Sequence, residues 1–144
     1  MLDIKFVQFL DKKFDKVLPK YTEEYNSKFN ELGFNKINSD FVEFWSKYND
    51  EIKGKLGILY PFAYEIRDFD KSLTKILRKQ LNLPIQYYSL FNFENEEHLF
   101  DDQDTATVIF ITSTNIQKFL IDNYCDKKWD TFKDFLEYHL NYKN

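Results

Sequence analysis

The sequence predicts an α+β fold: a single domain in which a mostly antiparallel or mixed central sheet packs against helices, with a further helix at the N-terminus. Residues 83–113 read as two or three neighbouring β-strands joined by acidic turns. The segments on either side place apolar residues at the three- and four-residue spacing of amphipathic helices. No internal repeat or linker divides the 144 residues, so one hydrophobic core is expected.

Three helices are expected before residue 50. The first covers residues 3–19 and is stopped by the proline at its end. The second has Thr22 as its N-cap and Gly33 as a left-handed residue at its C-terminus. The third has three candidate N-caps in residues 38–40, with Asp40 and Glu43 at capping-box spacing, and its apolar stripe is expected in the core. That stripe consists of Phe41, Phe44, Trp45 and Tyr48.

The proline at position 19 also suggests a division of the chain. Residues 1–20 are predicted to form an N-terminal helix that can be an appendage, and residues 21–144 are predicted to form the α+β domain itself. Whether the first helix packs on the domain is left open.

The middle of the chain alternates between strand and helix signals. Residues 56–66 carry apolar side chains at every second position, which predicts a strand, although Pro61 requires an edge position or a break. A helix over residues 69–81 follows, with Asp68 or Asp70 as its N-cap. Residues 85–93 are apolar at both alternating sets of positions, which favours a central strand covered on both faces.

The last third completes the sheet and adds two helices. Residues 105–112 form a β-branched run of ordinary strand length, which predicts a hairpin or meander with the preceding strand. Asn115 can cap a short helix, and Thr131 with Asp134 stands at capping-box spacing before the final one.

Charge and composition limit the classes of partner. The net charge is −4 at pH 7 and the pI is near 5.2. Only Arg67 and Arg78 offer guanidinium groups, so direct nucleic-acid binding is not expected. The single cysteine, Cys125, and an opening segment broken by charges predict a cytoplasmic protein without a signal peptide. No uncharged apolar run reaches membrane-spanning length, so no membrane partner is expected.

The most conspicuous polar residues are six carboxylates around one imidazole, His98. They are Glu94, Glu96, Glu97, Asp101, Asp102 and Asp104. Three interpretations stay open: a solvated acidic turn, an acidic surface that binds a protein, or a hard-metal or catalytic centre. His139 and Cys125 are expected to be structural, because the pattern offers neither of them the partners of a catalytic arrangement.

Two segments carry a family resemblance. The run FNELGFNKINSDFVEFWSKYN resembles the opening signature of the SUKH superfamily, and the segment TFKDFL at residues 131–136 is similar to its closing helix. Residues 83–104 stand where the central strands of that family fall, so the resemblance covers residues 21–140. The matching positions of the opening signature are Leu32, Gly33, Ile37, Asp40, Phe41, Phe44, Trp45, Tyr48 and Asn49.

The resemblance implies an α+β domain that binds other proteins. In bacteria it implies an immunity protein that neutralises a cognate polymorphic toxin made by the same cell, whereas eukaryotic relatives act in the regulation of cell-wall synthesis. It implies no cofactor and no catalytic residues.

These observations lead to one main hypothesis and two rivals. The main one is a non-enzymatic immunity protein that binds a cognate toxin domain through the acidic surface formed by the six carboxylates. The first rival is a small metal-dependent hydrolase that uses His98, Asp101, Asp102 and Asp104. The second rival is a structural subunit that buries its aromatic N-terminal helix in an oligomer. The identity of the partner and the oligomeric state are left open.

Overall fold

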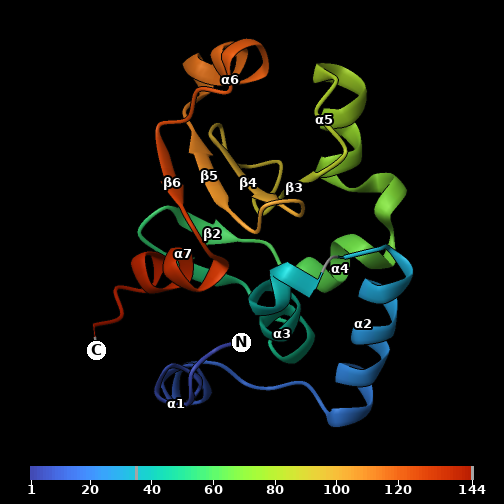
Figure 1. The fold of residues 1–144 in the computed structure, drawn as a ribbon. Helices are drawn as coiled ribbons and strands as arrows, with labels where there is room; N and C mark the ends of the chain where they lie inside the picture. Colours follow the sequence, from blue (N-terminus) through green and yellow to red (C-terminus); the bar gives the residue numbers. More distant parts are fainter. Residues whose placement is uncertain (35, 144) are drawn as a thin grey trace.

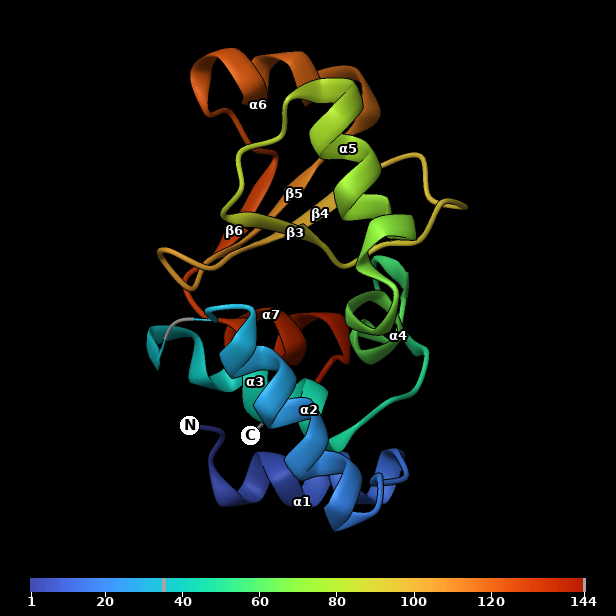
Figure 2. The ribbon, with the colours of Figure 1, turned by 90° about the vertical axis from the view of Figure 1, so that its right-hand side faces the viewer.

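In the computed structural model, which describes residues 1–34 and 36–143, a four-stranded antiparallel sheet lies between two groups of helices (Figures 1 and 2). The strand order β3-β4-β5-β6 follows the chain, so the sheet is a meander. The strands are β3 (Tyr87–Ser89), β4 (His98–Asp102), β5 (Val108–Ile111) and β6 (Lys127–Trp129). The predicted α+β fold with an antiparallel sheet packed against helices is confirmed.

Helices cover both faces of this sheet, as Figure 2 shows most clearly. On one face lie α5 (Leu73–Leu81) and α6 (Ile116–Asp122). The other face meets the larger group: α1 (Ile4–Lys13), α2 (Pro19–Glu31), α3 (Ser39–Lys47), α4 (Phe62–Arg67) and α7 (Phe132–His139). A separate hairpin, β1 (Ile52–Gly54) and β2 (Gly57–Leu59), and the short 3₁₀ turns η1 (Lys36–Asn38), η2 (Phe69–Lys71) and η3 (Ser113–Asn115) complete the described chain.

The alternation of side chains along β4 and β5 explains why the sheet can be covered twice. Leu99 faces the larger helical group and joins its cluster, while Phe100 faces α5 and α6. In β5, Val108 faces the larger helical group and Ile109 faces α5 and α6. Because successive side chains of a strand point to opposite faces, two apolar sets in one strand require two hydrophobic clusters.

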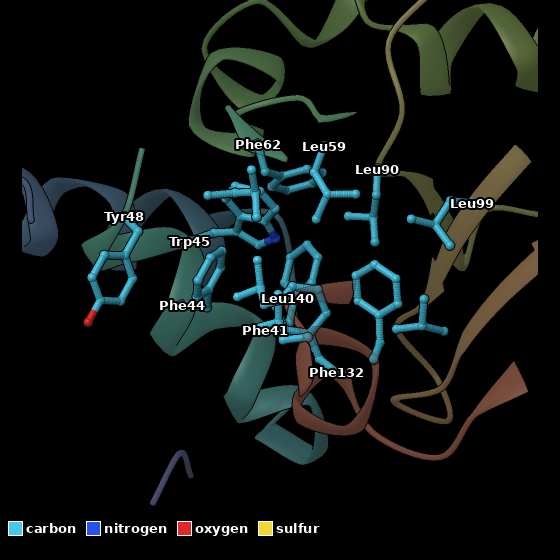
Figure 3. Packing of buried hydrophobic residues seen from close by; sticks show 14 of the residues in the cluster. Phe41, Phe44, Trp45, Tyr48, Leu59, Phe62, Leu90, Leu99, Phe132 and Leu140 are labelled. Carbon is cyan, nitrogen blue, oxygen red and sulfur yellow. The ribbon is translucent and has the colours of Figure 1, made fainter. Parts of the chain in front are cut away.

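The larger cluster is built mainly of aromatic rings (Figure 3). The ring of Phe41 lies 4.9 Å from that of Phe62 and 5.2 Å from that of Phe132, with centroids as reference points, and both pairs meet edge to face. Trp45 is fully buried, so the apolar stripe of the third helix is a core stripe as predicted. Edge-to-face pairs of this kind add stabilisation beyond that of the buried area.

Several helix boundaries differ from the predicted ones. α1 ends at Lys13 rather than at the proline, and α2 begins with Pro19 itself, because proline has a helical φ and its missing N–H is not needed at a first position. The N-cap residue of α2 is Leu18 rather than Thr22, whereas α3 has one of its three candidate residues, Asn38, at the N-cap position. The N-cap of α5 is Ser72 rather than Asp68 or Asp70, and its hydroxyl accepts from the Lys75 N–H at 3.1 Å.

Other local predictions are confirmed. Gly33 has a φ of +77°, so the left-handed end of α2 is present as expected. Asn115 is the N-cap residue of α6. Thr131 caps α7, and its hydroxyl accepts from the Asp134 N–H at 3.0 Å.

Two strand predictions are wrong. Within residues 56–66 the strand is limited to the short β2. Pro61 then precedes α4, whose Phe62, Ala63 and Ile66 are buried on one helical face. The strand expected over residues 85–93 is limited to β3, which lies at an edge of the sheet and not in its centre.

The N-terminal helix packs on the domain core. Leu2, Phe6 and Leu10 are buried within the large cluster, and the Asp3 carboxylate forms a 2.8 Å ion pair with Lys133 of α7. Of the apolar stripe predicted for this helix, Leu10 is buried and Val7 packs against the cluster, whereas Leu18 is 60% exposed. Among the described residues, no helix combines the length and apolarity needed to cross a bilayer.

Candidate functional site

The six carboxylates expected to form one acidic surface lie in three different places. Glu94, Glu96 and Glu97 are exposed in the loop between β3 and β4. Asp101 and Asp102 belong to β4 and are buried, and Asp104 is exposed in the turn between β4 and β5. The loop and the turn stand at opposite ends of the five-residue strand β4, roughly 15 Å apart. The carboxylates therefore do not form one continuous surface.

Asp101 links the helical layer to the sheet. Its Oδ2 accepts hydrogen bonds from Asn38 Nδ2 at 2.6 Å and from Gln103 Nε2 at 2.5 Å, and its side chain is fully buried. Burial raises the pKa of this carboxyl well above its ordinary value. Asn38 stands at the start of α3, so this bond ties that helix to β4. The prediction that Asp101 belongs to an exposed partner-binding surface is wrong.

Asp102 shapes the turn that follows β4. Its Oδ1 accepts the Asp104 N–H at 2.9 Å, and its backbone carbonyl accepts the Ala106 N–H at 2.8 Å. Ala106 has a φ of +65°, a left-handed conformation that is uncommon for residues other than glycine and asparagine, and the bonds of this turn hold it there. Asp102 is 6% exposed, so its predicted place on an exposed surface is also wrong.

The residues of the hydrolase hypothesis do not converge. His98 and Asp102 share one face of β4, whereas Asp101 points to the other. The His98 ring packs 5.5 Å from that of Phe100, and burial lowers its pKa. Within residues 1–34 and 36–143, no group of three or more His, Cys, Asp or Glu side chains is placed to hold a metal ion.

His139 has the structural role that the sequence predicted. It is 1% exposed, stacks on Phe135 at 5.4 Å, and its Nε2 lies 3.0 Å from the Ile52 carbonyl oxygen of β1. Its burial lowers its pKa, which favours the neutral ring. Gly54 passes so close that a Cβ there would meet the His139 carbonyl oxygen.

The exposed part of the predicted site is the acidic loop, which we define as residues 92–97. Phe93, in its middle, is 57% exposed. The loop is folded by local bonds: Asn92 Oδ1 accepts the Phe93 N–H at 2.7 Å, and the Asn92 carbonyl accepts the Asn95 N–H at 3.2 Å. The Asn95 side chain lies against Gly57 of the β1–β2 hairpin, whose neighbour Ile58 is 39% exposed.

A pocket of about 230 Å³ lies beside the acidic loop, between that loop, α4 and η2. Its lining includes three aromatic rings, two carboxyls and an ammonium group. They are those of Tyr60, Tyr64, Phe93, Glu65, Asp68 and Lys71.

Glu65 is the least expected residue of this pocket, because it is a carboxyl group that is only 5% exposed. Its Oε2 accepts from Thr74 Oγ1 at 3.4 Å, and the same hydroxyl accepts the Ser89 N–H at 2.9 Å. Burial raises the pKa of Glu65 to about 8, so the group is mainly protonated at pH 7.

Glu65 lies outside the predicted site because the alternation of residues 56–66 predicts a strand, in which a carboxylate can face the solvent. In a helix, Glu65 falls between Phe62, Ile66 and Phe69 in the apolar stripe, and a carboxylate in such a stripe signals a buried acid. If Pro61 is taken as the start of a helix, the sequence shows this carboxylate within an apolar stripe.

Comparison with known proteins supplies no relative. No protein-family model matches the chain, and neither the curated proteins nor the solved structures contain a significant match.

Proposed function

We propose that this chain is a non-enzymatic protein-binding module that neutralises a basic partner in the cytoplasm, as an immunity protein neutralises a cognate toxin. The observation that carries the proposal is the exposure of Phe93, at 57%, within a loop that also exposes Glu94, Glu96 and Glu97. Single exposed apolar side chains are common on protein surfaces, so the proposal depends on the combination of this exposed ring with three exposed carboxylates in one loop.

The composition of the acidic loop suits this role. Aromatic residues are enriched at the buried centres of protein interfaces, and charged residues form their rims. Here one ring and three carboxylates belong to the same six-residue loop, and no Lys or Arg occurs from residue 91 to residue 117. Such a one-signed potential accelerates encounter with a basic surface and discriminates against acidic proteins.

The resemblance to the SUKH superfamily supports the toxin part of the proposal. The residues that carry it include Phe41, Phe44 and Trp45, which are buried in the core. They describe the scaffold of the domain and not its interaction surface. Partner choice would then depend on exposed loops, where the acidic loop is found.

The proposal is tested with the protein encoded by the neighbouring gene. If that protein arrests growth when expressed alone, co-expression of this chain should restore growth. Reversing three charges of the acidic loop should abolish the rescue, and the purified complex should weaken at least tenfold at low salt. The variant carries Glu94→Lys, Glu96→Lys and Glu97→Lys.

A matched control reverses three exposed charges of α2 with the same net change. It carries Glu23→Lys, Glu24→Lys and Glu31→Lys. This control should still rescue growth. Equal loss of rescue in both variants, or full rescue by the loop variant, would contradict binding through the acidic loop. Affinity of the wild-type protein should also fall with added salt, because salt screens exposed charges.

A further inference from the structure

We infer that the pocket beside the acidic loop receives the cationic side chain of a lysine or arginine from the basic partner. The inference rests on the proposed function, which it extends from a charged loop to an anchoring site. The pocket, of about 230 Å³, has room for an extended basic side chain, and Phe93 belongs both to the pocket wall and to the acidic loop.

The walls of the pocket suit a cation that has an apolar stem. The Tyr60 and Tyr64 rings stand 6.1 Å apart between centroids, and Phe93 adds a third ring. Aromatic faces attract ammonium and guanidinium groups and also cover the methylene groups of the stem. The chain already uses Tyr64 in this way, since the Arg67 guanidinium lies 5.4 Å from its ring centroid.

The lining of the pocket also includes a buried carboxyl group. Glu65 lies there at 5% exposure, hydrogen-bonded to Thr74. The other charged side chains that line the pocket are Asp68 and Lys71, which form a 3.7 Å ion pair with each other at 58% and 85% side-chain exposure. Because both members of this pair are exposed, Glu65 is the buried carboxyl among the residues that line the pocket.

The chemistry of the lining disfavours other occupants. An anion would meet the Asp68 carboxylate in the lining and the carboxylates of the acidic loop outside the pocket, and the one ammonium group of the lining, that of Lys71, is already paired with Asp68. An apolar side chain would remove water from the Glu65 carboxyl without offering it a partner, which is costly. A cation compensates the carboxyl as that group ionises, and the released proton passes to the solvent.

Proton release provides a specific signature. The pKa of Glu65, raised by burial to about 8, means that below this pH a cation must displace a proton when it binds. Affinity for a cation should therefore increase with pH, by up to about tenfold per pH unit below pH 8, and level off above it. The change should disappear when Glu65 cannot ionise.

The test uses small probes on the full chain. N-acetyl-lysine methylamide and N-acetyl-arginine methylamide are titrated at pH 6.5, 7.5 and 8.5, with nuclear magnetic resonance of the Glu65 carboxyl carbon and the tyrosine rings as readout. N-acetyl-norleucine methylamide is the uncharged control. We expect shifts at Tyr60, Tyr64 and Glu65 with the cationic probes only, and stronger binding at the higher pH.

Two variants and one control sharpen the result. Glu65→Gln should remove the pH dependence, and Tyr64→Leu should weaken binding by about two- to fivefold without removing it. Glu51→Gln makes the same substitution at an exposed position, and it should change neither the affinity for the probes nor its pH dependence. Equal shifts with the norleucine probe, or an unchanged pH dependence in Glu65→Gln, would overturn the inference.

The outcome is separable from that of the proposed function. If Glu65→Gln and Tyr64→Leu retain full rescue and full affinity for the neighbouring protein while the acidic-loop variant loses both, the pocket inference fails and the proposed function stands. If the lysine probe binds with the expected pH signature but the chain rescues no growth arrest, the cation site stands and the proposed function fails.

Discussion

Glu65, Glu96 and Asp101 show how differently the fold treats side chains of the same chemistry. Glu96 is exposed in the acidic loop, Glu65 is nearly buried beside a pocket, and Asp101 is fully buried between a helix and the sheet. A solvated carboxylate pays no desolvation penalty, whereas a buried one must be protonated or must accept hydrogen bonds. Of the three, only Glu96 has the exposed position that the sequence suggested for the acidic run in general.

The buried position of Asp101 makes charge reversal there a test of the fold. Asp101→Lys places an ammonium group among Asn38, Gln103 and the main core, and it should cost about 3–5 kcal/mol or prevent folding. Glu96→Lys should change stability by within about 0.5 kcal/mol. Urea unfolding of the two variants measures both effects. Equal stability would mean that Asp101 is exposed in solution.

The protonation of Glu65 makes stability depend on pH. Its folded-state pKa of about 8 lies above the ordinary 4.5, so the folded chain keeps a proton that the unfolded chain releases. The stability that this proton contributes is complete below about pH 4.5, falls as the pH rises, and is lost above about pH 8. The slope is about 1.4 kcal/mol per pH unit.

Glu65→Gln should remove this slope and be more stable than the wild-type protein at pH 8.5, by on the order of 3 kcal/mol. Asp101, whose pKa is also raised, contributes a slope of the same sign that remains in the variant. Urea unfolding at pH 6.5 and pH 8.5 provides the comparison. A variant less stable than the wild type at the higher pH would show that Glu65 is stabilised in its ionised form.

At the scale of elements, the two edges of the sheet are protected differently. The outer edge of β3 is covered by α5: the Arg78 guanidinium donates to the Ile85 carbonyl at 2.7 Å and reaches the Tyr87 carbonyl at 3.4 Å, and Thr74 accepts the Ser89 N–H. The opposite edge strand, β6, has three residues and exposes Lys127 and Lys128. Short length and lysine side chains are ordinary means of preventing edge pairing between molecules.

The protection of the outer edge of β3 depends on the Arg78 guanidinium group, which donates to two backbone carbonyls there. Arg78→Ala should cost about 1–3 kcal/mol, because it removes charge-assisted bonds and the stacking on Tyr88 at 4.8 Å. It should also promote self-association through the uncovered edge, which size-exclusion chromatography at increasing concentration detects. The neighbouring exposed Lys79→Ala is the control. A monomeric Arg78→Ala variant of unchanged stability would contradict this role.

At the scale of the whole molecule, the order of layers decides which segments are indispensable. The sheet is covered on one face by α5 and α6 and on the other by α3, α4 and α7, and α1 closes the larger cluster from outside (Figure 2). The Phe6 ring lies 5.0 Å from that of Tyr142 near the C-terminus. The first helix thus joins the last residues of the chain in the same core.

Removing the contribution of α1 should therefore affect the entire domain. Phe6→Ala should cost about 3–5 kcal/mol, the range for a fully buried aromatic ring, whereas Ile4→Ala, at a position 75% exposed, should cost less than about 0.5 kcal/mol. Thermal and urea unfolding should each show a single transition, shifted only in the first variant. If Phe6→Ala unfolds as the wild type does, α1 is an appendage after all.

The sequence by itself determined the fold class, the core stripe of α3 and the N-cap positions at Asn115 and Thr131. These features depend on spacing within a few residues, and the period of 3.6 or 2 directly expresses local backbone geometry. Only the tertiary structure decided that residues 62–67 form a helix, that β3 is an edge, that α1 belongs to the core, and that Asp101 is buried while Glu96 is not. Burial of a charged residue depends on what lies opposite it, here Asn38, which is 63 positions away in the chain. No local pattern contains that information, so the acidic run looked uniform until the chain was folded.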